Sequence, residues 1–273
     1  RDREDQLWFN LERIGLGKYT PQKDELETYS NLRFKDLISL RAVNCALELA
    51  DELWVGAAYE SIINVFHKQG NDISLHRSID LYQYADDIGI PRQLFSDSKK
   101  NLWVGTTRGV MYKKQREEQF YRIADIDGDI VAIAEDHKGK IWIATKDHGI
   151  YQIDSQRSWK PTKRIGQQTA GLHSDQIETM DADTQGNLWV GTKDNRLLSF
   201  HIASEQIEEY ANALLFSSNQ ILHVVCLDST VWVSTTRNVY KLFPADKRIF
   251  EYSTSDGVPV NMFTKGAYTA NKQ

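Results

Sequence analysis

The stretch Lys100-Asn101-Leu102-Trp103-Val104-Gly105-Thr106-Thr107-Arg108-Gly109 decides the fold, because its pattern recurs along the chain. Close copies are Gly186-Asn187-Leu188-Trp189-Val190-Gly191-Thr192 and Lys140-Ile141-Trp142-Ile143-Ala144-Thr145. Looser copies surround Trp8, Trp54 and Trp232. The six tryptophans follow one another at intervals of 39 to 49 residues, and a period of about 45 residues is typical of a solenoid, a propeller or another repeat array.

Length and composition favour one large all-β domain over residues 1–273. Of the 273 residues, 41% are hydrophobic and 11% aromatic, which is ample for a core. A net charge of −5 argues against a nucleic-acid partner, since such proteins normally carry a basic patch. No apolar run approaches the roughly 18 residues of a membrane helix. The chain opens in the middle of a repeat, so we expect a piece of a longer protein and read nothing from missing targeting signals.

Each repeat is predicted to form four short strands. In the clearest copy these are residues 130–134, 140–145, 149–153 and a fourth near 159–165, with a tight turn at 136–139. Strand side chains alternate between two sides, so Trp142 points one way while Ile141 and Ile143 point the other. Both sides are therefore apolar, which predicts sheets stacked face to face like the blades of a propeller.

The six tryptophans are predicted to fill the gaps between adjacent blades, a core role that we prefer over stacking on sugars. A small residue lies two places after five of them, on the same strand face, where it would let the neighbouring sheet come close. These small residues are Gly56, Gly105, Ala144, Gly191 and Ser234. Trp159 lies outside the repeat, and its exposure is left open.

The repeats predict an all-β propeller of about six four-stranded blades in this chain, with seven open for an intact protein. Inner strands are expected near 43–49, 92–96, 130–136, 176–180, 220–227 and 261–267. Repeat one begins at its second strand near Gln6, so the last inner strand could lie beside residues 6–10 and close a ring. Cys45 and Cys226 lie about four repeats apart, so we expect free thiols rather than a disulfide.

Several segments resemble a known repeat. They are residues 183–192, which read Asp-Thr-Gln-Gly-Asn-Leu-Trp-Val-Gly-Thr, residues 101–112, the linking segment 171–177, and residues 256–263 with 266–267. Across nearly the whole chain, the repeats resemble the two-component regulator propeller family. Repeats one, two and six depart from its pattern; repeat two, for example, has Ala57-Ala58-Tyr59 after its first glycine.

The resemblance implies the periplasmic or extracytoplasmic input region of a membrane-anchored bacterial signalling protein. Such proteins are often hybrid histidine kinases and sometimes diguanylate cyclases, and the best known respond to oligosaccharides. The expected partners are a polar small molecule or oligosaccharide and neighbouring domains of the same protein, with a homodimer as a further option. No kinase or cyclase is present in the sequence.

No motif predicts a catalytic residue, a metal ligand or a cofactor. Residues 181–186 imitate the start of a calcium loop, but the twelfth position is Thr192 rather than Glu, and the segment is one copy of the repeat's turn. His173-Ser174-Asp175 holds the residue types of a hydrolase triad, yet sequential neighbours point apart. The seven histidines show no close metal-ligand spacing, and His223 is expected in the core.

Polar side chains gather in the loops that follow the second strands. Such loops meet on one face of a propeller, and their mixture of an aromatic ring, donors and carboxylates suits a polar ligand. The predicted binding residues are Tyr59, Arg108, Lys146, His148, Lys193, Asn195 and Arg237. The leading hypothesis is a sensor propeller without enzymatic activity; the alternatives are a protein-interaction scaffold and, less favoured, a propeller lyase of the antibiotic-inactivating type.

Overall fold

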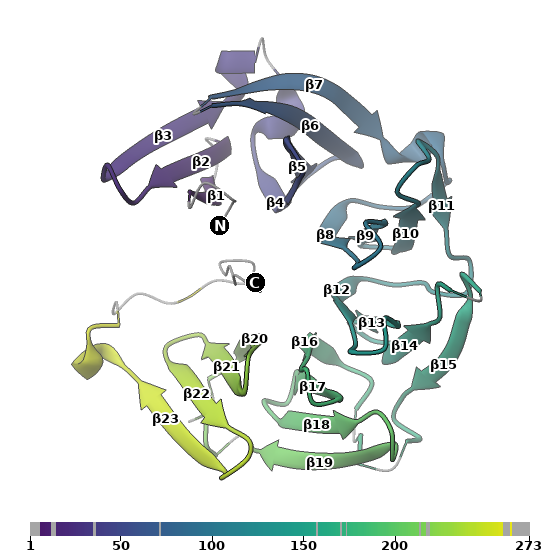
Figure 1. Ribbon diagram of the computed structural model, residues 1–273, viewed down its shortest axis with the longest axis vertical. Coiled ribbons are helices and arrows are strands. Elements are labelled where there is room, and N and C mark those ends of the chain that lie inside the picture. The colour runs from purple at the N-terminus through teal and green to yellow at the C-terminus, as the bar shows by residue number, and fades with distance from the viewer. Residues whose placement is uncertain are drawn as a thin grey trace. The chain divides into compact units, whose positions relative to one another are not determined.

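The computed structural model describes residues 6–11, 15–34, 37–70, 72–156, 158–169, 171–172, 174–212, 214–216, 219–258 and 263. These residues form 23 β-strands and four short 3-10 helices (Figure 1). The strands make five four-stranded sheets and one three-stranded sheet, each a run of consecutive antiparallel strands. We call each sheet a blade. The chain divides into two compact units, Arg1–Ala124 and Asp125–Gln273.

The first unit contains three blades. Blade 1 comprises β1 (Leu7–Leu11), β2 (Gly15–Thr20) and β3 (Glu25–Ser30); blade 2 comprises β4 (Val43–Leu49), β5 (Glu52–Ala57), β6 (Ile62–Gln69) and β7 (Asp72–Asp80); blade 3 comprises β8 (Pro91–Ser96), β9 (Leu102–Thr106), β10 (Gly109–Lys113) and β11 (Phe120–Arg122). Three 3-10 helices join them, namely η1 (Asn31–Phe34), η2 (Ile38–Leu40) and η3 (Leu81–Gln83).

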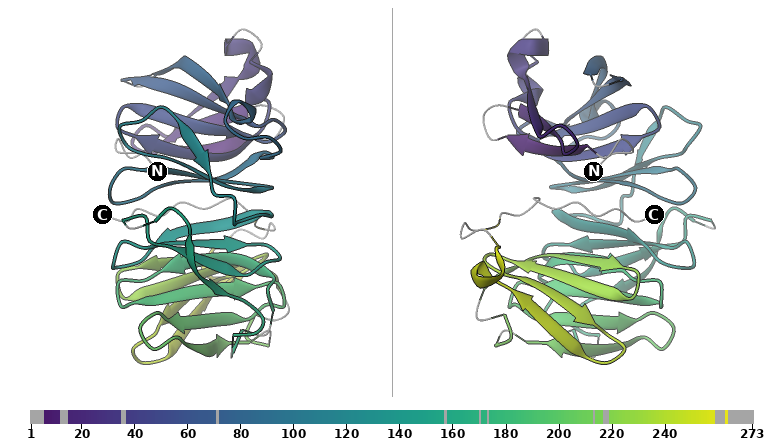
Figure 2. Two further views of the ribbon diagram at one scale, coloured as in Figure 1. Left: turned by 90° about the vertical axis from the view of Figure 1, so that its right-hand side faces the viewer. Right: turned by 60° about the vertical axis from the view of Figure 1, so that its left-hand side comes forward.

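The second unit also contains three blades. Blade 4 comprises β12 (Ile130–Glu135), β13 (Ile141–Thr145), β14 (Ile150–Ile153) and β15 (Pro161–Ile165); blade 5 comprises β16 (Ile177–Ala182), β17 (Asn187–Thr192), β18 (Leu197–His201) and β19 (Gln206–Ala211); blade 6 comprises β20 (Ile221–Leu227), β21 (Thr230–Thr235), β22 (Val239–Phe243) and β23 (Arg248–Tyr252). The 3-10 helix η4 (Thr254–Asp256) follows. Figure 2 shows these blades from the side.

The five complete blades confirm the predicted strand order. Inner strands β4, β8, β12, β16 and β20 each lie within two residues of the expected start and end. The first blade begins at its second strand, as predicted, and has three strands. The last expected inner strand, at 261–267, lies outside the described residues apart from Phe263.

The repeated tryptophans are core residues. Trp54, Trp103, Trp142 and Trp189 are buried, whereas Trp8 and Trp232 are half-buried. Trp142 of blade 4 packs edge-on against Phe200 of blade 5, with ring centroids 5.9 Å apart. The prediction that these indoles fill the space between blades is therefore confirmed for adjacent blades of this unit. Trp159 is half-buried.

The small residues after the tryptophans permit close packing of neighbouring blades, as predicted. A Cβ atom added to Gly56 would lie 2.8 Å from the Cβ of Pro91 in blade 3. A Cβ atom added to Gly191 would lie 2.8 Å from Cγ2 of Ile221 in blade 6. Ordinary van der Waals contacts begin at about 3.4 Å, so a side chain at either position would push the blades apart.

Polar contacts also join adjacent inner strands. The amide of Val224 in β20 donates to the Thr179 hydroxyl of β16 at 3.1 Å, and the amide of Cys226 donates to Oδ2 of Asp181 at 2.8 Å.

Both cysteines are free of disulfide bonds, as expected. Burial raises the pKa of the Cys45 thiol to about 12. Within the described segments there is no helix of sufficient length and hydropathy to span a bilayer.

Candidate functional site

A buried threonine fixes the loop after the second strand in blades 3 to 6. Thr145 shows the arrangement: its hydroxyl donates to the Gly149 carbonyl at 2.8 Å and accepts the His148 amide at 3.0 Å. In blade 6 the Thr235 hydroxyl makes both contacts with the backbone of Asn238. These side chains are almost fully buried. The loops that carry most of the predicted binding residues therefore have a defined backbone.

In the first unit, one predicted binding residue has an exposed side chain and the other forms an ion pair. Tyr59 follows β5 and is 78% exposed. Arg108 follows β9 and forms an ion pair with Asp87 in the loop before β8. Its carbonyl also accepts a bond from Arg122 at 3.2 Å. The loop that carries Arg108 is thus held by other residues of blade 3. The guanidinium of Arg108 is paired with the carboxylate of Asp87, which the sequence alone did not show.

In the second unit, the remaining five predicted residues lie at the same end of three consecutive blades. The amide of Ile177, at the start of β16, donates to the Lys146 carbonyl of blade 4 at 3.1 Å. The amide of Ile221, at the start of β20, donates to Oδ1 of Asn195 of blade 5 at 3.4 Å. The loops of blades 4 and 5 therefore each contact the first strand of the next blade. In blade 6 the amide of Thr236 donates to the carbonyl of Gln220, next to Ile221, so the three loops lie along the same end of the blades.

Exposure separates the side chains that can meet a ligand from those that hold the loops. His148, Lys193 and Arg237 are exposed, whereas Lys146 and Asn195 are half-buried. Asn195 has a positive φ of 61°, which asparagine tolerates better than most residues, and its side-chain oxygen already accepts a backbone bond. Asn195 is thus a positioning residue for the loop, while its exposed neighbours supply donors and charge.

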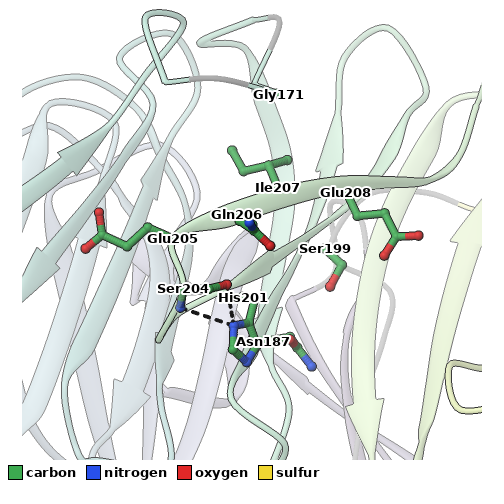
Figure 3. A pocket seen from close by; sticks show the side chains of 9 residues that line it. All are labelled: Gly171, Asn187, Ser199, His201, Ser204, Glu205, Gln206, Ile207 and Glu208. Carbon is green, nitrogen blue, oxygen red and sulfur yellow. Dashed lines mark hydrogen bonds between the residues drawn. The ribbon is translucent and has the colours of Figure 1, made fainter.

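A second polar region lies at the other end of blade 5 and was not predicted. It is an open hollow of about 790 Å³ lined by residues of β17, β18, β19 and nearby loops. The lining residues, shown in Figure 3, are Gly171, Asn187, Ser199, His201, Ser204, Glu205, Gln206, Ile207 and Glu208. Because residues 202–205 connect β18 to β19, this hollow lies at the opposite end of β18 from Lys193 and Asn195.

The hollow holds a serine–histidine contact, but it serves the turn. Nδ1 of His201 lies 2.7 Å from the Ser204 hydroxyl and also accepts the Ser204 amide at 3.2 Å (Figure 3). Glu205 pairs with Lys163 of blade 4, and Glu208 pairs with Lys247 of blade 6. The side chains here brace the turn and join neighbouring blades, so the hollow is a weaker candidate than the predicted loops.

A third group was missed because its members come from three different strands and meet only through their register. Glu52, His67 and His76 of blade 2 place their ligand atoms within 4.8 Å of one another. The sequence does hold one signal: β6 and β7 are consecutive antiparallel strands, and His67 and His76 lie one on each of them. His223 is buried in β20, as predicted.

The comparisons with known proteins bear on the repeat itself. Residues 125–147 match the family model described as the two component regulator propeller. This segment is a repeat of that family. It spans β12, the turn at Asp136 and β13, the same part of the repeat on which the sequence resemblance was based. No curated protein sequence matches the chain.

Solved structures share the propeller architecture at low sequence identity. An extracellular domain assigned to a hybrid two-component system of B. thetaiotaomicron is 15% identical with a TM-score of 0.56, and the match covers 92% of this chain and 42% of that one. YCF48 bound to D1 peptide is 14% identical with a TM-score of 0.69, covering 95% and 81%. PorZ, a surface component of the type-IX secretion system of Porphyromonas gingivalis, is 16% identical with a TM-score of 0.58, covering 92% and 44%.

These likenesses establish the fold and nothing finer. The chain has a β-propeller fold, as predicted, and carries a regulator-propeller repeat. It spans less than half the length of the B. thetaiotaomicron domain and of PorZ.

Proposed function

We propose that this chain is the sensing propeller of a bacterial two-component or related membrane-anchored signalling protein, and that it lies outside the cytoplasm. Its ligand is a polar molecule, with oligosaccharides as the leading class. The regulator-propeller repeat at residues 125–147 supports the signalling assignment. The propeller fold supports a binding domain, because the loops of the described blades offer a rigid platform.

The loops of blades 4, 5 and 6 carry the proposal. They present exposed His148, Lys193 and Arg237 on backbones fixed by buried threonines. Asp147 and Asp194 are exposed in the same loops and supply acceptors. A rigid array of donors and acceptors suits a hydroxyl-rich ligand, because little conformational entropy is lost on binding.

A signal would leave the propeller through its packing against neighbouring domains. The blades of each unit interlock through buried tryptophans and close strand contacts, so they move as bodies rather than deforming locally. Ligand binding would then change how the propeller packs on an adjoining domain or on a second copy. Neighbouring domains of the same protein are the proposed partners.

A thermal-shift screen against an oligosaccharide library tests the proposal. We expect at least one oligosaccharide to raise the midpoint of unfolding and to bind in calorimetry. The Lys193→Ala/Arg237→Ala double variant should weaken this binding about tenfold or more, since it removes two charged donors. Lys247→Ala is the matched control, because Lys247 is an exposed lysine at the opposite end of its blade.

Other outcomes would identify the competing functions. If no oligosaccharide binds but an adjoining domain does, the chain is a protein-interaction scaffold, a role for which the 78% exposed ring of Tyr59 is suited. YCF48, a propeller of similar fold, is bound to a peptide. If a library compound is converted to product, the chain is an enzyme, and the sensing assignment is wrong.

A further inference from the structure

Blade 2 contains a cluster of three metal-ligand side chains from three adjacent strands. They are Glu52 of β5, His67 of β6 and His76 of β7, and their ligand atoms lie within 4.8 Å of one another. It is the one group of this kind found among the described residues. Glu52 and His67 are half-buried and His76 is exposed, so the cluster is open to an ion from solvent.

Strand register explains why these residues meet. Glu52 lies directly opposite His67 in the β5–β6 pair, so both side chains are on one face. In the β6–β7 pair, Val65 faces Arg77 while Phe66 faces Leu75, which leaves His76 as the extra residue of a β-bulge. A bulge redirects a side chain at a chosen place, and here the rings of His76 and His67 lie 4.1 Å apart between centroids.

Neighbouring groups hold the carboxylate of Glu52 in position. The indole Nε1–H of Trp54 donates to Oε2 at 3.1 Å, and Nη1 of Arg77 donates to Oε1 at 3.1 Å. A carboxylate has about four lone-pair sites, so each oxygen keeps acceptor capacity beyond these bonds. Donors that orient a ligating carboxylate are a regular feature around bound metals.

We propose that Glu52, His67 and His76 bind a divalent transition-metal ion, with Zn²⁺ as the ion that best suits the set. Two imidazoles and one carboxylate are ligands that Zn²⁺ takes in four-coordinate sites, with the fourth position left to water or another donor. The ion would cross-link β5, β6 and β7, and so stabilise blade 2. The positive charge of Arg77 opposes the ion, so we expect weaker binding than at a dedicated structural zinc site. This inference is independent of the proposed sensing function.

Calorimetric titration of the chain with ZnCl2 tests the site. We expect one Zn²⁺ per chain, and a loss of affinity of about tenfold or more in each of His67→Ala, His76→Gln and Glu52→Gln. His201→Ala is the matched control: it removes another imidazole, at the end of β18, and should bind Zn²⁺ like the unmodified chain. Circular dichroism of each variant checks that it is folded, and the exposed position of His76 makes His76→Gln the least disruptive of the three.

A second measurement distinguishes coordination by these three residues from non-specific metal binding. Co²⁺ in place of Zn²⁺ should give visible absorption bands typical of four-coordinate nitrogen and oxygen ligands, and these bands should disappear in His76→Gln. The proposal is overturned if the unmodified chain binds no Zn²⁺, or if the folded His76→Gln and Glu52→Gln variants bind it as tightly as the unmodified chain. In either case the two rings and the Glu52–Arg77 pair are packing interactions only.

Discussion

The indole Nε1–H of Trp142 donates to Oδ2 of Asp136 at 2.8 Å, and both side chains are buried. Oδ1 of the same carboxylate accepts the amides of Lys138 and Lys140, at 2.8 and 3.0 Å. One carboxylate therefore closes the turn between β12 and β13 and satisfies the indole that fills the space beside the next blade. The same pairs occur as Asp97–Trp103 at 3.0 Å and Asp183–Trp189 at 2.8 Å.

This pair predicts that Asp136 is important for stability although it lies in a turn. Asp136→Ala leaves a buried indole N–H and two amides without their acceptor, so we expect the free energy of unfolding to fall by about 2–3 kcal/mol. Urea denaturation measures the change. Asp125→Ala, at an exposed position of the same unit, should change stability by less than about 0.5 kcal/mol. Equal stability of the two variants would contradict the role of the pair.

Among the described residues, the looser repeats of blades 2 and 6 differ at this pair. In blade 2 the Trp54 indole donates to Glu52 instead, at 3.1 Å. In blade 6 the residue six places before Trp232 is Cys226, and the Trp232 ring is half-buried and stacked 6.0 Å from Tyr252. In blade 6 the missing aspartate thus coincides with a less buried tryptophan, whereas Trp54 of blade 2 stays buried with Glu52 as its acceptor.

Close approach of blades 5 and 6 predicts that Gly191 tolerates no side chain. A Cβ atom there would lie 2.8 Å from methyl carbons of both Ile221 and Thr179. Gly191→Ala should therefore lower the free energy of unfolding by about 1–3 kcal/mol through overpacking. Thr184→Ala, at an exposed turn of the same blade, is the control for a substitution to alanine away from the interface. A Gly191→Ala protein that unfolds at the same urea concentration as the control would show that the interface between the blades relaxes freely.

Much of the fold follows from sequence because two signals agree. The repeat gives the number and order of strands, and the alternation around Trp142 gives the two buried faces. Both signals depend on local pattern, so β4 was predicted to the residue. Half-burial of Trp8 and Trp232 was not predicted, since all six tryptophans were expected to fill the gaps between blades.

The sites could be predicted only in part, because side-chain partners depend on contacts that no periodic pattern encodes. The loop positions of Lys193 and Arg237 follow from the strand order. The ion pair of Arg108 with Asp87 and the bond from Ile221 to Asn195 join segments that are distant in sequence. The bulge at His76 shifts the alternation of side chains along β7 by one residue. A sequence pattern with a period of two residues cannot reveal such a shift.

A partly buried charge network in blade 1 predicts a pH-dependent contribution to stability. Nζ of Lys18 is buried and lies 3.0 Å from Oε2 of Glu27, which also accepts the Tyr29 hydroxyl at 2.7 Å. The Tyr29 hydrogen bond, with the bond and charge of Lys18, holds the pKa of the Glu27 carboxyl below its ordinary value. A carboxyl with a lowered pKa stabilises the folded state above its ordinary pKa, and this contribution is lost as the pH falls through the lowered value.

Glu27→Gln should therefore destabilise the protein at neutral pH and much less in acid. We expect a loss of about 1–2 kcal/mol at pH 7, because Lys18 stays buried without its counter-charge while the exposed part of Glu27 limits the effect. The difference from the unmodified chain should shrink as the pH falls below about 4.3, as measured by urea denaturation at each pH. Glu25→Gln, on the same strand and exposed, should show neither effect. A difference that stays constant with pH would contradict the assigned charge on Glu27.

The buried hydroxyl of Thr145 gives the last prediction, which concerns the loop that carries His148. Thr145→Val keeps the shape of the side chain but removes the donor to Gly149 and the acceptor for the His148 amide. We expect a loss of about 1–2 kcal/mol in the free energy of unfolding, with faster hydrogen exchange at the amide of His148. An oligosaccharide that binds the unmodified chain should bind this variant more weakly, although every proposed contact residue is retained, because the loop is no longer held in its bound conformation. Thr162→Val makes the same chemical change at an exposed position of the same blade and should leave exchange at His148 unaltered. If both variants exchange at the same rate, the hydroxyl does not fix the loop, and the rigidity argument for the binding face fails.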